Sequence, residues 1–372
     1  MIQIEFLPAF NGDCIHIMID NEKHILIDGG LARTYVKTLQ NKLQEVKQAS
    51  KNLDLVVITH IDNDHLVGIQ KLFGDNKYKS LVKKVWFNTG STLNNYFDIK
   101  CESTKIDTAP TNNRAENEIG FKGAIKLEDV LDELNIINRV PIKAMDVIYL
   151  DDIYFKILSP DTDRLYKLTK GWNRVVKELE RRAEEEVAGH SNDYDRTIEE
   201  LVKNDFKKDT SISNGSSIAF LMQYQNFKFL FLADTFTEVI IQSLKKFRYT
   251  KDRPLKVDFV KLSHHGSKKN INKELLELID TDTYIISTNG NRHNHPNQEA
   301  LSRIIMFNKN KGIRSKFIFN YQKKGNLENM FQLYEFKKST NERYSIYYNK
   351  EYQFYLYFPL NARDGAVLNY DL

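Results

Sequence analysis

The sequence predicts an α/β protein, arranged as an αβ/βα sandwich in which helices cover the outer faces of two packed sheets. Three observations support this fold class. The first 60 residues alternate between strand-like runs and turns, the later part returns to strands that alternate with helical segments, and residues 53–59 form a continuous apolar run. Such a run is typical of a strand that is covered on both faces.

The N-terminal part is expected to form a small sheet followed by a helix. The predicted strands are residues 2–6, 14–19, 24–27, 53–59 and 82–87. The third strand ends at Asp28-Gly29-Gly30, where glycine permits the positive φ that a sharp turn requires. Residues 31–50 carry helical spacing, and a second helix is expected around 124–136.

The second half is expected to repeat this plan around a helical insertion. Its predicted strands are residues 147–158 as a hairpin, then 217–224, 227–233, 258–262 and 284–287. Residues from about 162 to 212 are rich in Lys, Arg and Glu and are interpreted as a solvated helical insertion. We therefore expect one domain over residues 1–310. A β-rich C-terminal extension over 311–372 would pack on the domain or form an oligomer interface.

Composition indicates a globular protein that lies outside the membrane. Of the 372 residues, 41% are hydrophobic and 28% are charged, and the net charge of +4 permits a polyanionic substrate without requiring one. No apolar run approaches the roughly 18 residues that span a bilayer. The N-terminus has no signal-peptide pattern, and Cys14 and Cys101 form no ligand cluster, so a reducing cytoplasm is expected.

Four metal-ligand side chains follow the buried strand directly. His60, Asp62, Asp64 and His65 lie within six residues, in a loop whose origin the sheet holds in place. At this spacing, His60 and Asp62 can face one metal ion while Asp64 and His65 face a second. Gly68 then allows the following helix to pack closely. The sequence therefore predicts a two-metal site at this loop.

The loop resembles the His-x-His-x-Asp-His signature of the metallo-β-lactamase superfamily, with Asp62 in the place of the second histidine. Collinear segments support the resemblance, namely residues 11–13, 27–30, 229–234 and 261–267. It implies the four-layer αβ/βα fold and a metal-dependent hydrolase. A carboxylate in place of an imidazole makes the first site harder, which shifts its preference from zinc toward manganese or magnesium.

A closer similarity is to the hydrolase domain of the ComEC family of DNA-uptake proteins and its soluble relatives. The shared features are Asp62, Asn214 with Ser217, the string His264-His265-Gly266-Ser267, and His295-Pro296. The resemblance covers about residues 1–90, 145–161 and 211–305. The transmembrane channel of ComEC is absent, so a role in DNA uptake does not follow.

The resemblance implies two divalent ions, Zn or Mn. The first would be held by His60, Asp62 and the bridging Asp234, and the second by Asp64, His65, Asp234 and His264. The superfamily histidine that follows the strand ending at residues 159–161 is missing, which leaves Asp161 as a candidate fourth ligand of the first ion.

The expected mechanism uses a hydroxide held between the two ions. Asp64 would orient this nucleophile, and His265 would support the site or contact the substrate. His295 or His293 would bind a phosphate oxygen or protonate the leaving group, although this segment could equally be a solvated loop. Ser267 and Lys268 would bind phosphate at the start of a helix, and Arg292 adds positive charge nearby.

Three functions stay open from the sequence. The first is a phosphodiesterase or nuclease that acts on a nucleic acid or nucleotide. The second is a C–O or C–N bond hydrolase of the lactonase or amidohydrolase type, against which Asp62 counts. The third is a metal-binding sensor or interaction module that joins an oligomer or partner protein through residues 311–372.

Overall fold

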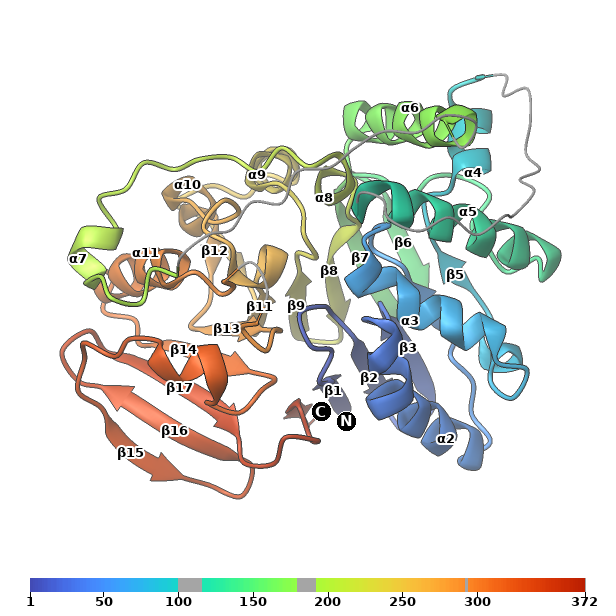
Figure 1. The fold of residues 1–372 in the computed structure, drawn as a ribbon. Helices are drawn as coiled ribbons and strands as arrows, with labels where there is room; N and C mark the ends of the chain where they lie inside the picture. Colours follow the sequence, from blue (N-terminus) through green and yellow to red (C-terminus); the bar gives the residue numbers. More distant parts are fainter. Residues whose placement is uncertain (100–115, 179–191, 292–293, 372) are drawn as a thin grey trace.

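Two β-sheets packed face to face form the centre of the molecule (Figure 1). The structure is a computed structural model that describes residues 1–99, 116–178, 192–291 and 294–371. The first sheet has the order β18-β1-β2-β3-β4-β5. Its strands are β1 (Ile2–Phe6), β2 (Ile15–Ile19), β3 (Lys23–Ile27), β4 (Leu55–Val57), β5 (Val85–Trp86) and β18 (Ala366–Tyr370).

The second sheet is larger and has the order β15-β16-β17-β14-β13-β11-β9-β8-β7-β6. These strands are β6 (Val147–Leu150), β7 (Ile153–Ser159), β8 (Ala219–Tyr224), β9 (Phe227–Phe231), β11 (Phe259–Lys261), β13 (Thr283–Ile286), β14 (Ser315–Phe319), β15 (Lys337–Thr340), β16 (Tyr344–Asn349) and β17 (Phe354–Pro359). A separate short pair joins β10 (Leu255–Lys256) to β12 (Ile279–Asp280).

The alternation of side chains along each strand creates the layers. In β9, Phe229 and Phe231 point into the core between the sheets, whereas Leu230 points to the outer face. Aromatic rings join the two sheets directly. Phe6 of β1 lies 5.6 Å from Phe259 of β11, and Trp86 of β5 lies 5.0 Å from Phe155 of β7, measured between ring centroids.

Helices cover both outer faces (Figure 1). The first sheet is covered by α1 (Ala32–Thr34), the π-helical turn η1 (Tyr35–Leu39), α2 (Gln40–Gln48), α3 (Asn63–Gly74), α4 (Gly90–Tyr96), α5 (Glu116–Glu133) and α6 (Thr162–Glu178). The second is covered by α7 (Ile198–Leu201), α9 (Thr237–Lys246), α10 (Lys273–Glu277) and α11 (Gln298–Lys309). This arrangement confirms the predicted αβ/βα sandwich.

The segment predicted as a solvated insertion is only partly solvated. One face of α6 is buried, because Leu165, Leu168 and Trp172 join the core on the first sheet. The chain later docks on the other half, where Asp193 accepts hydrogen bonds from the backbone N–H groups at the start of α11. It ends in α8 (Ile212–Gly215), which precedes β8. Most of the charged run at 178–186 lies outside the described residues.

The residues after 310 supply strands to both sheets. β14 pairs parallel to β13, β17 pairs parallel to β14, and β18 returns to pair antiparallel to β1. The pairing of β18 with β1 places the two chain ends side by side (Figure 1). Among the described residues, no helix combines the length and apolar character needed to cross a membrane.

Candidate metal centre

The predicted ligand loop connects β4 to α3. His60 lies in the loop, Asp62 precedes the first residue of α3, and Asp64 and His65 lie in its first turn. Gly68, one turn later, packs against the turn that follows β3. A Cβ atom at Gly68 would lie 1.8 Å from the carbonyl oxygen of Gly29, so glycine is required for this approach. The close contact holds the loop against the sheet.

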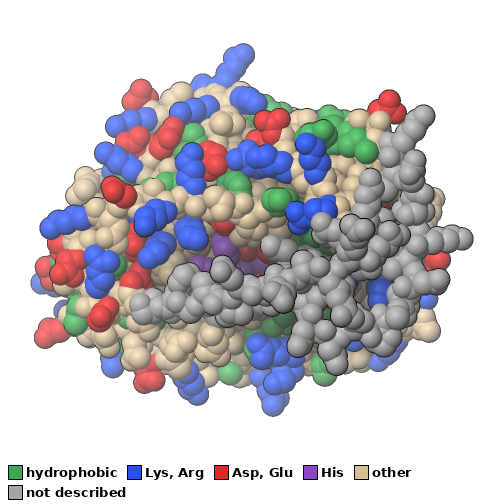
Figure 2. Space-filling model, turned by 45° about the horizontal axis from the view of Figure 1, so that its top comes forward, with side chains coloured by type: hydrophobic (Ala, Val, Ile, Leu, Met, Phe, Trp, Pro, Cys, Tyr) green, Lys and Arg blue, Asp and Glu red, His purple; other side chains and the backbone are tan. Residues whose placement is uncertain are grey.

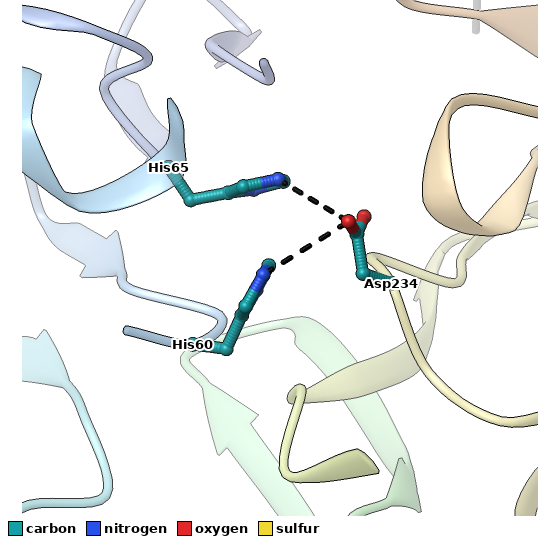
Figure 3. Close-up of side chains that lie close together, drawn as sticks. All are labelled: His60, His65 and Asp234. Carbon is teal, nitrogen blue, oxygen red and sulfur yellow. Dashed lines mark ion pairs between the residues drawn. The ribbon is translucent and has the colours of Figure 1, made fainter. Parts of the chain in front are cut away.

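Four imidazoles converge on a single carboxylate oxygen, Oδ2 of Asp234, in the turn after β9. The distances from this oxygen to the Nε2 atoms are 3.9 Å for His60, 3.6 Å for His65, 3.9 Å for His264 and 3.7 Å for His265. Figure 3 shows His60 and His65 reaching Asp234 from the opposite half of the molecule. The two halves of the sandwich therefore meet at this carboxylate.

An oxygen atom of the protein faces Nδ1 of each imidazole. His65 donates to Asp28 at 2.8 Å, and His265 donates to the carbonyl of Ser287 at 2.8 Å. Thr59 gives its hydroxyl proton to Asp28 at 2.7 Å, so its oxygen accepts from His60 at 3.0 Å. With the proton on Nδ1, each ring presents the lone pair of Nε2 to the centre.

The central atoms are buried and lack hydrogen-bond partners. They include the Nε2 atoms of His60, His65 and His265, and Oδ1 of Asp234. Among the described residues, three groups each have donor atoms within 4.8 Å of one another, namely His60 with His65 and Asp234, Asp64 with His65 and His265, and Asp13 with Asp28 and His65. Buried donors without partners are costly unless something binds them. The donor set of imidazoles and carboxylates fits divalent metal ions.

Two further carboxylates border this centre at its open side. Oδ2 of Asp62 lies 3.5 Å from Nε2 of His60, and Oδ2 of Asp64 lies 3.8 Å from Nε2 of His265. Their side chains are 27% and 21% exposed, whereas His60 and His65 are fully buried. Asn11 donates to Asp64 Oδ2 at 2.8 Å and holds it in place. Solvent therefore reaches the centre past Asp62 and Asp64.

A buried ion pair lies beside His265 of the centre. Lys261, at the end of β11, contacts the carboxylate of Asp13, and both side chains are buried. Oδ1 of Asp13 lies 3.6 Å from Nδ1 of His265. Burial alone would raise the pKa of Asp13, but Lys261 and His265 hold it well below its usual value. Asp13 is therefore an anion within the protein interior.

The electrostatics of the ion-free centre favour positive charge. Burial lowers the pKa of His65, yet the carboxylates of Asp234 and Asp28 raise it well above the usual value. Burial likewise opposes the charge on His264, while Asp234 and Asp209 raise its pKa to about 9. The carboxylates of the centre thus attract protons to its histidines, as expected of ligands for which divalent ions and protons compete.

Several residues at the centre have left-handed backbone conformations. The φ angles are 57° at Asp28, 44° at Ala233, 47° at His264 and 54° at His265. Such conformations cost on the order of 1–3 kcal/mol each for residues other than glycine and are concentrated at functional sites. In the turn after β11, they direct His264 and His265 to different sides of the centre.

The structure brings the six predicted ligands together but distributes the histidine pair differently from our expectation. His265, and not His264, belongs to the set with Asp64 and His65. His264 lies beside Asp234 with its Nδ1 atom facing Asp209 at 3.2 Å. Asp161 belongs to none of these sets, and its carboxylate accepts hydrogen bonds from the backbone N–H and the guanidinium of Arg164.

The residues predicted to contact substrate have mixed positions. His295 is buried, and its ring centroid lies 4.8 Å from that of His264, so it borders the centre. Ser267 is buried and accepts from the backbone of Lys269, and the Lys268 ammonium pairs with Glu299 at 3.4 Å. Arg292 and His293, like Cys101, lie outside the described residues.

The sequence interpretation missed most of the supporting residues. Asp28 and Asp13 were interpreted only as turn residues, and Asp209 and Lys261 were given no role. Asp28 and Asp13 do carry a signal, since each is an acidic residue at the end of a predicted strand or in its turn. Asp209 carries none, because it lies in a charged segment where acidic residues are common.

Histidine side chains are visible near the centre of the face shown in Figure 2, with many Lys and Arg side chains above and to the left. Asp and Glu side chains are interspersed among them on this face.

Comparison with known proteins finds one family model that matches part of the chain. Residues 9–124 match the family profile of the metallo-beta-lactamase superfamily. The match includes Asp13, Asp28 and the loop from His60 to His65, but ends before Asp234. No curated protein matches the sequence of this chain.

Similar folds occur among solved structures at low sequence identity. YhfI from Bacillus subtilis, described as a metallo-beta-lactamase fold protein, is 8% identical, with 82% of this chain and 93% of that chain covered and a TM-score of 0.38. Zn(2+)-bound PqqB from Methylobacterium extorquens is 10% identical, with 100% of both chains covered and a TM-score of 0.42. CmlA from Streptomyces venezuelae, a diiron β-hydroxylase, is 11% identical, with 84% of this chain and 52% of that chain covered and a TM-score of 0.40.

Proposed function

We propose that this protein is a metal-dependent hydrolase of the metallo-β-lactamase superfamily that binds two divalent ions, Zn or Mn. One observation carries the proposal. Four imidazole Nε2 atoms converge within 3.9 Å of a single oxygen of Asp234, and three of them are buried without a hydrogen-bond partner. A protein interior does not leave this many polar atoms unpaired unless they bind something.

We assign the ligands to the two ions from the distances between their donor atoms. His60 and Asp62 would hold the first ion, and Asp64, His65 and His265 would hold the second, with Asp234 bridging both. Asp62 makes the first set richer in oxygen than a set with two histidines, which favours a harder ion such as manganese there. The neutral, Nδ1-protonated form of the rings is the form that binds metal through Nε2.

When bound, the two ions would lower the pKa of water and stabilise the negative charge that develops on the substrate. Asp64, held by Asn11 and partly exposed, would orient the attacking water at the open side of the centre. His295, next to His264, would contact the substrate oxygen that leaves. The buried Asp13–Lys261 pair would keep His265 aligned without contacting the substrate.

We further propose that the substrate is a phosphodiester in a nucleic acid or nucleotide. A cleft of about 500 Å³ lies between α2, the edge strand β18 and the turn before β16. Lys37, Arg343 and Arg363 line it, and none of the three is within ion-pair distance of an acid in the described part of the chain. This positive charge suits phosphate groups of a substrate that extends beyond the metal centre.

Two of the three acidic residues that line this cleft share the ammonium group of Lys42, whereas Asp364 has no ion-pair partner among the described residues. Glu5 pairs with Lys42 at 2.8 Å, and Glu45 contacts the same ammonium group. Leu7, in the wall of the cleft, lies only a few residues before Asn11 in the loop that enters the metal centre. The segment from Leu7 to Asn11 therefore runs from the wall of the cleft to the metal centre.

The test begins with the metal content of the purified protein, measured by elemental analysis. The protein would then be reloaded with Mn or Zn and assayed on bis-p-nitrophenyl phosphate, single-stranded DNA, duplex DNA and a lactone. We expect two ions per chain and hydrolysis of at least one phosphodiester. Hydrolysis of the lactone alone would overturn the substrate proposal, and tight metal binding without any hydrolysis would favour a sensor.

A further inference from the structure

The insertion before β8 places one buried carboxylate beside the metal centre. Asp209 is buried and accepts hydrogen bonds from the backbone N–H of Ser211 at 3.0 Å and from the side chain of Asn214 at 2.8 Å. Its Oδ2 atom lies 3.2 Å from Nδ1 of His264. Among the ion pairs of the described residues, Asp209 has no Lys or Arg partner. A buried carboxylate of this kind requires its hydrogen bonds to be satisfied locally.

The hydrogen bond to Asp209 determines which nitrogen of His264 faces the centre. A carboxylate only accepts hydrogen bonds, so Nδ1 of His264 carries the proton. Nε2 then has the lone pair, and it lies 3.9 Å from Oδ2 of Asp234, the same distance as Nε2 of His60. Asp28 holds His65 in the same way, through Nδ1 at 2.8 Å.

The surroundings of His264 place it on the side of the first ion. The helix α8 lies behind both His264 and Asp62, since Asn214 approaches Nδ1 of His264 at 3.4 Å and Ser213 lies beside the carboxylate of Asp62. His265 faces the opposite side, where it contacts Asp13 and Asp64. The two adjacent histidines therefore face opposite sides of the centre.

We propose that Asp209 is a positioning residue that presents Nε2 of His264 to the first ion as its fourth protein ligand, beside His60, Asp62 and Asp234. This inference rests on the two-metal site of the proposed function. With this role of Asp209, the insertion over residues 162–212 would help to form the metal centre. Residues 192–209 dock on α11 through Asp193 and Tyr194, and Asp209 then reaches the centre.

The test compares Asp209→Asn with His264→Ala and with the double variant. Asp205→Asn is the matched control, because Asp205 is exposed in the same segment. Metal stoichiometry and affinity would be measured by equilibrium dialysis against Mn and Zn. Removal of a supporting carboxylate typically weakens metal affinity about 10–100-fold. We expect this loss for one ion only in Asp209→Asn, and none in Asp205→Asn.

The double variant tests whether Asp209 acts through His264. If it does, the double variant binds metal no more weakly than His264→Ala alone. Wild-type affinity for both ions in Asp209→Asn, or an additional loss in the double variant, would overturn the inference.

Nitrogen NMR of histidine-labelled, zinc-loaded wild-type protein provides a readout that does not depend on any variant folding. We expect His264 to carry its proton on Nδ1 and to bind the ion through Nε2, and the opposite tautomer would overturn the inference. Failure of the wild type to bind any metal would instead overturn the proposed function. Two bound ions without phosphodiester hydrolysis would leave the role of Asp209 standing while removing the proposed substrate.

Discussion

Two clusters of buried histidines lie in the described part of the chain, and one of them is arranged as a candidate metal centre. The first contains the four imidazoles around Asp234. The second contains His16 of β2 and His24 of β3, whose rings stack at 5.2 Å on the outer face of the first sheet. His16 donates to Glu5 at 3.0 Å and accepts from Nδ1 of His24 at 3.0 Å. Both clusters combine histidine with carboxylate.

The difference between the clusters lies in where the free nitrogen atoms point. At the centre, each Nδ1 is occupied and the Nε2 atoms converge on one oxygen. In the pair, His16 uses both nitrogen atoms for hydrogen bonds, which leaves only Nε2 of His24 without a partner. A single donor atom cannot hold a divalent ion. Buried histidines therefore indicate metal binding only when several lone pairs converge.

The largest effect is expected for a variant that disrupts the centre and leaves His16 and His24 unchanged. Replacement Asp234→Ala removes the oxygen that the four rings share, so at least one ion and most of the activity should be lost, on the order of 10³-fold in rate. His24→Gln should leave the metal content unchanged. Elemental analysis and the phosphodiester assay check both variants. Loss of metal from His24→Gln would remove the distinction between the clusters.

A smaller effect is expected at His295, which borders the centre without belonging to either ligand set. His295→Ala should lower kcat by about 10²-fold, because a group positioned to assist the leaving oxygen is lost. Its metal content should equal that of the wild type. Steady-state kinetics and elemental analysis on the same preparation measure kcat and the metal content. A parallel loss of metal would make His295 a ligand.

The smallest effect is expected on the free energy of unfolding, to which the His16–His24 pair contributes. Burial, together with the neighbouring His16, lowers the pKa of His24 to about 4, although Asp54 opposes this. The unfolded chain therefore binds a proton that the folded protein excludes. The associated stability is fully present above pH 6.5 and is lost as the pH falls toward 4, by about 3 kcal/mol.

Urea unfolding between pH 4 and 7, followed by circular dichroism, measures this contribution. His24→Gln cannot titrate, so its free energy of unfolding should fall less steeply over the same range. Equal pH slopes in the two proteins would show that His24 does not titrate as expected. Zinc-loaded wild type and zinc-loaded His24→Gln serve as a control, because metal at the centre should raise the stability of both proteins without changing the difference between them.

Local sequence was sufficient to predict most strands and the ligand loop. Strands at residues 2–6, 227–233 and 284–287 were predicted because alternation and apolar runs are local properties of the chain. The observed strands are Ile2–Phe6, Phe227–Phe231 and Thr283–Ile286. His60, Asp62, Asp64 and His65 were predicted for a similar reason, since all four lie in one short loop after a buried strand. Asp234 and His264 required the family resemblance, because each is an isolated residue far along the chain.

Other features depended on contacts that local patterns do not encode. The tail was predicted as a β-rich extension, but its strands β14, β17 and β18 join both sheets by pairing with distant partners. One face of α6 is buried on the first sheet, although its charged composition suggested a solvated helix. Pairing and docking depend on which surfaces meet in the folded chain.

The amino-acid sequence alone determined the sandwich class, the position of the ligand loop and the chemical kind of the site. These follow from side-chain periodicity and from ligand types at close spacing. Only the tertiary structure decided that His265 joins Asp64 and His65 while His264 turns to Asp209. Residues that are adjacent in the sequence lie close together, but their side chains can point in different directions. The left-handed backbone of the turn at 264–265 directs the two rings to opposite sides of the centre.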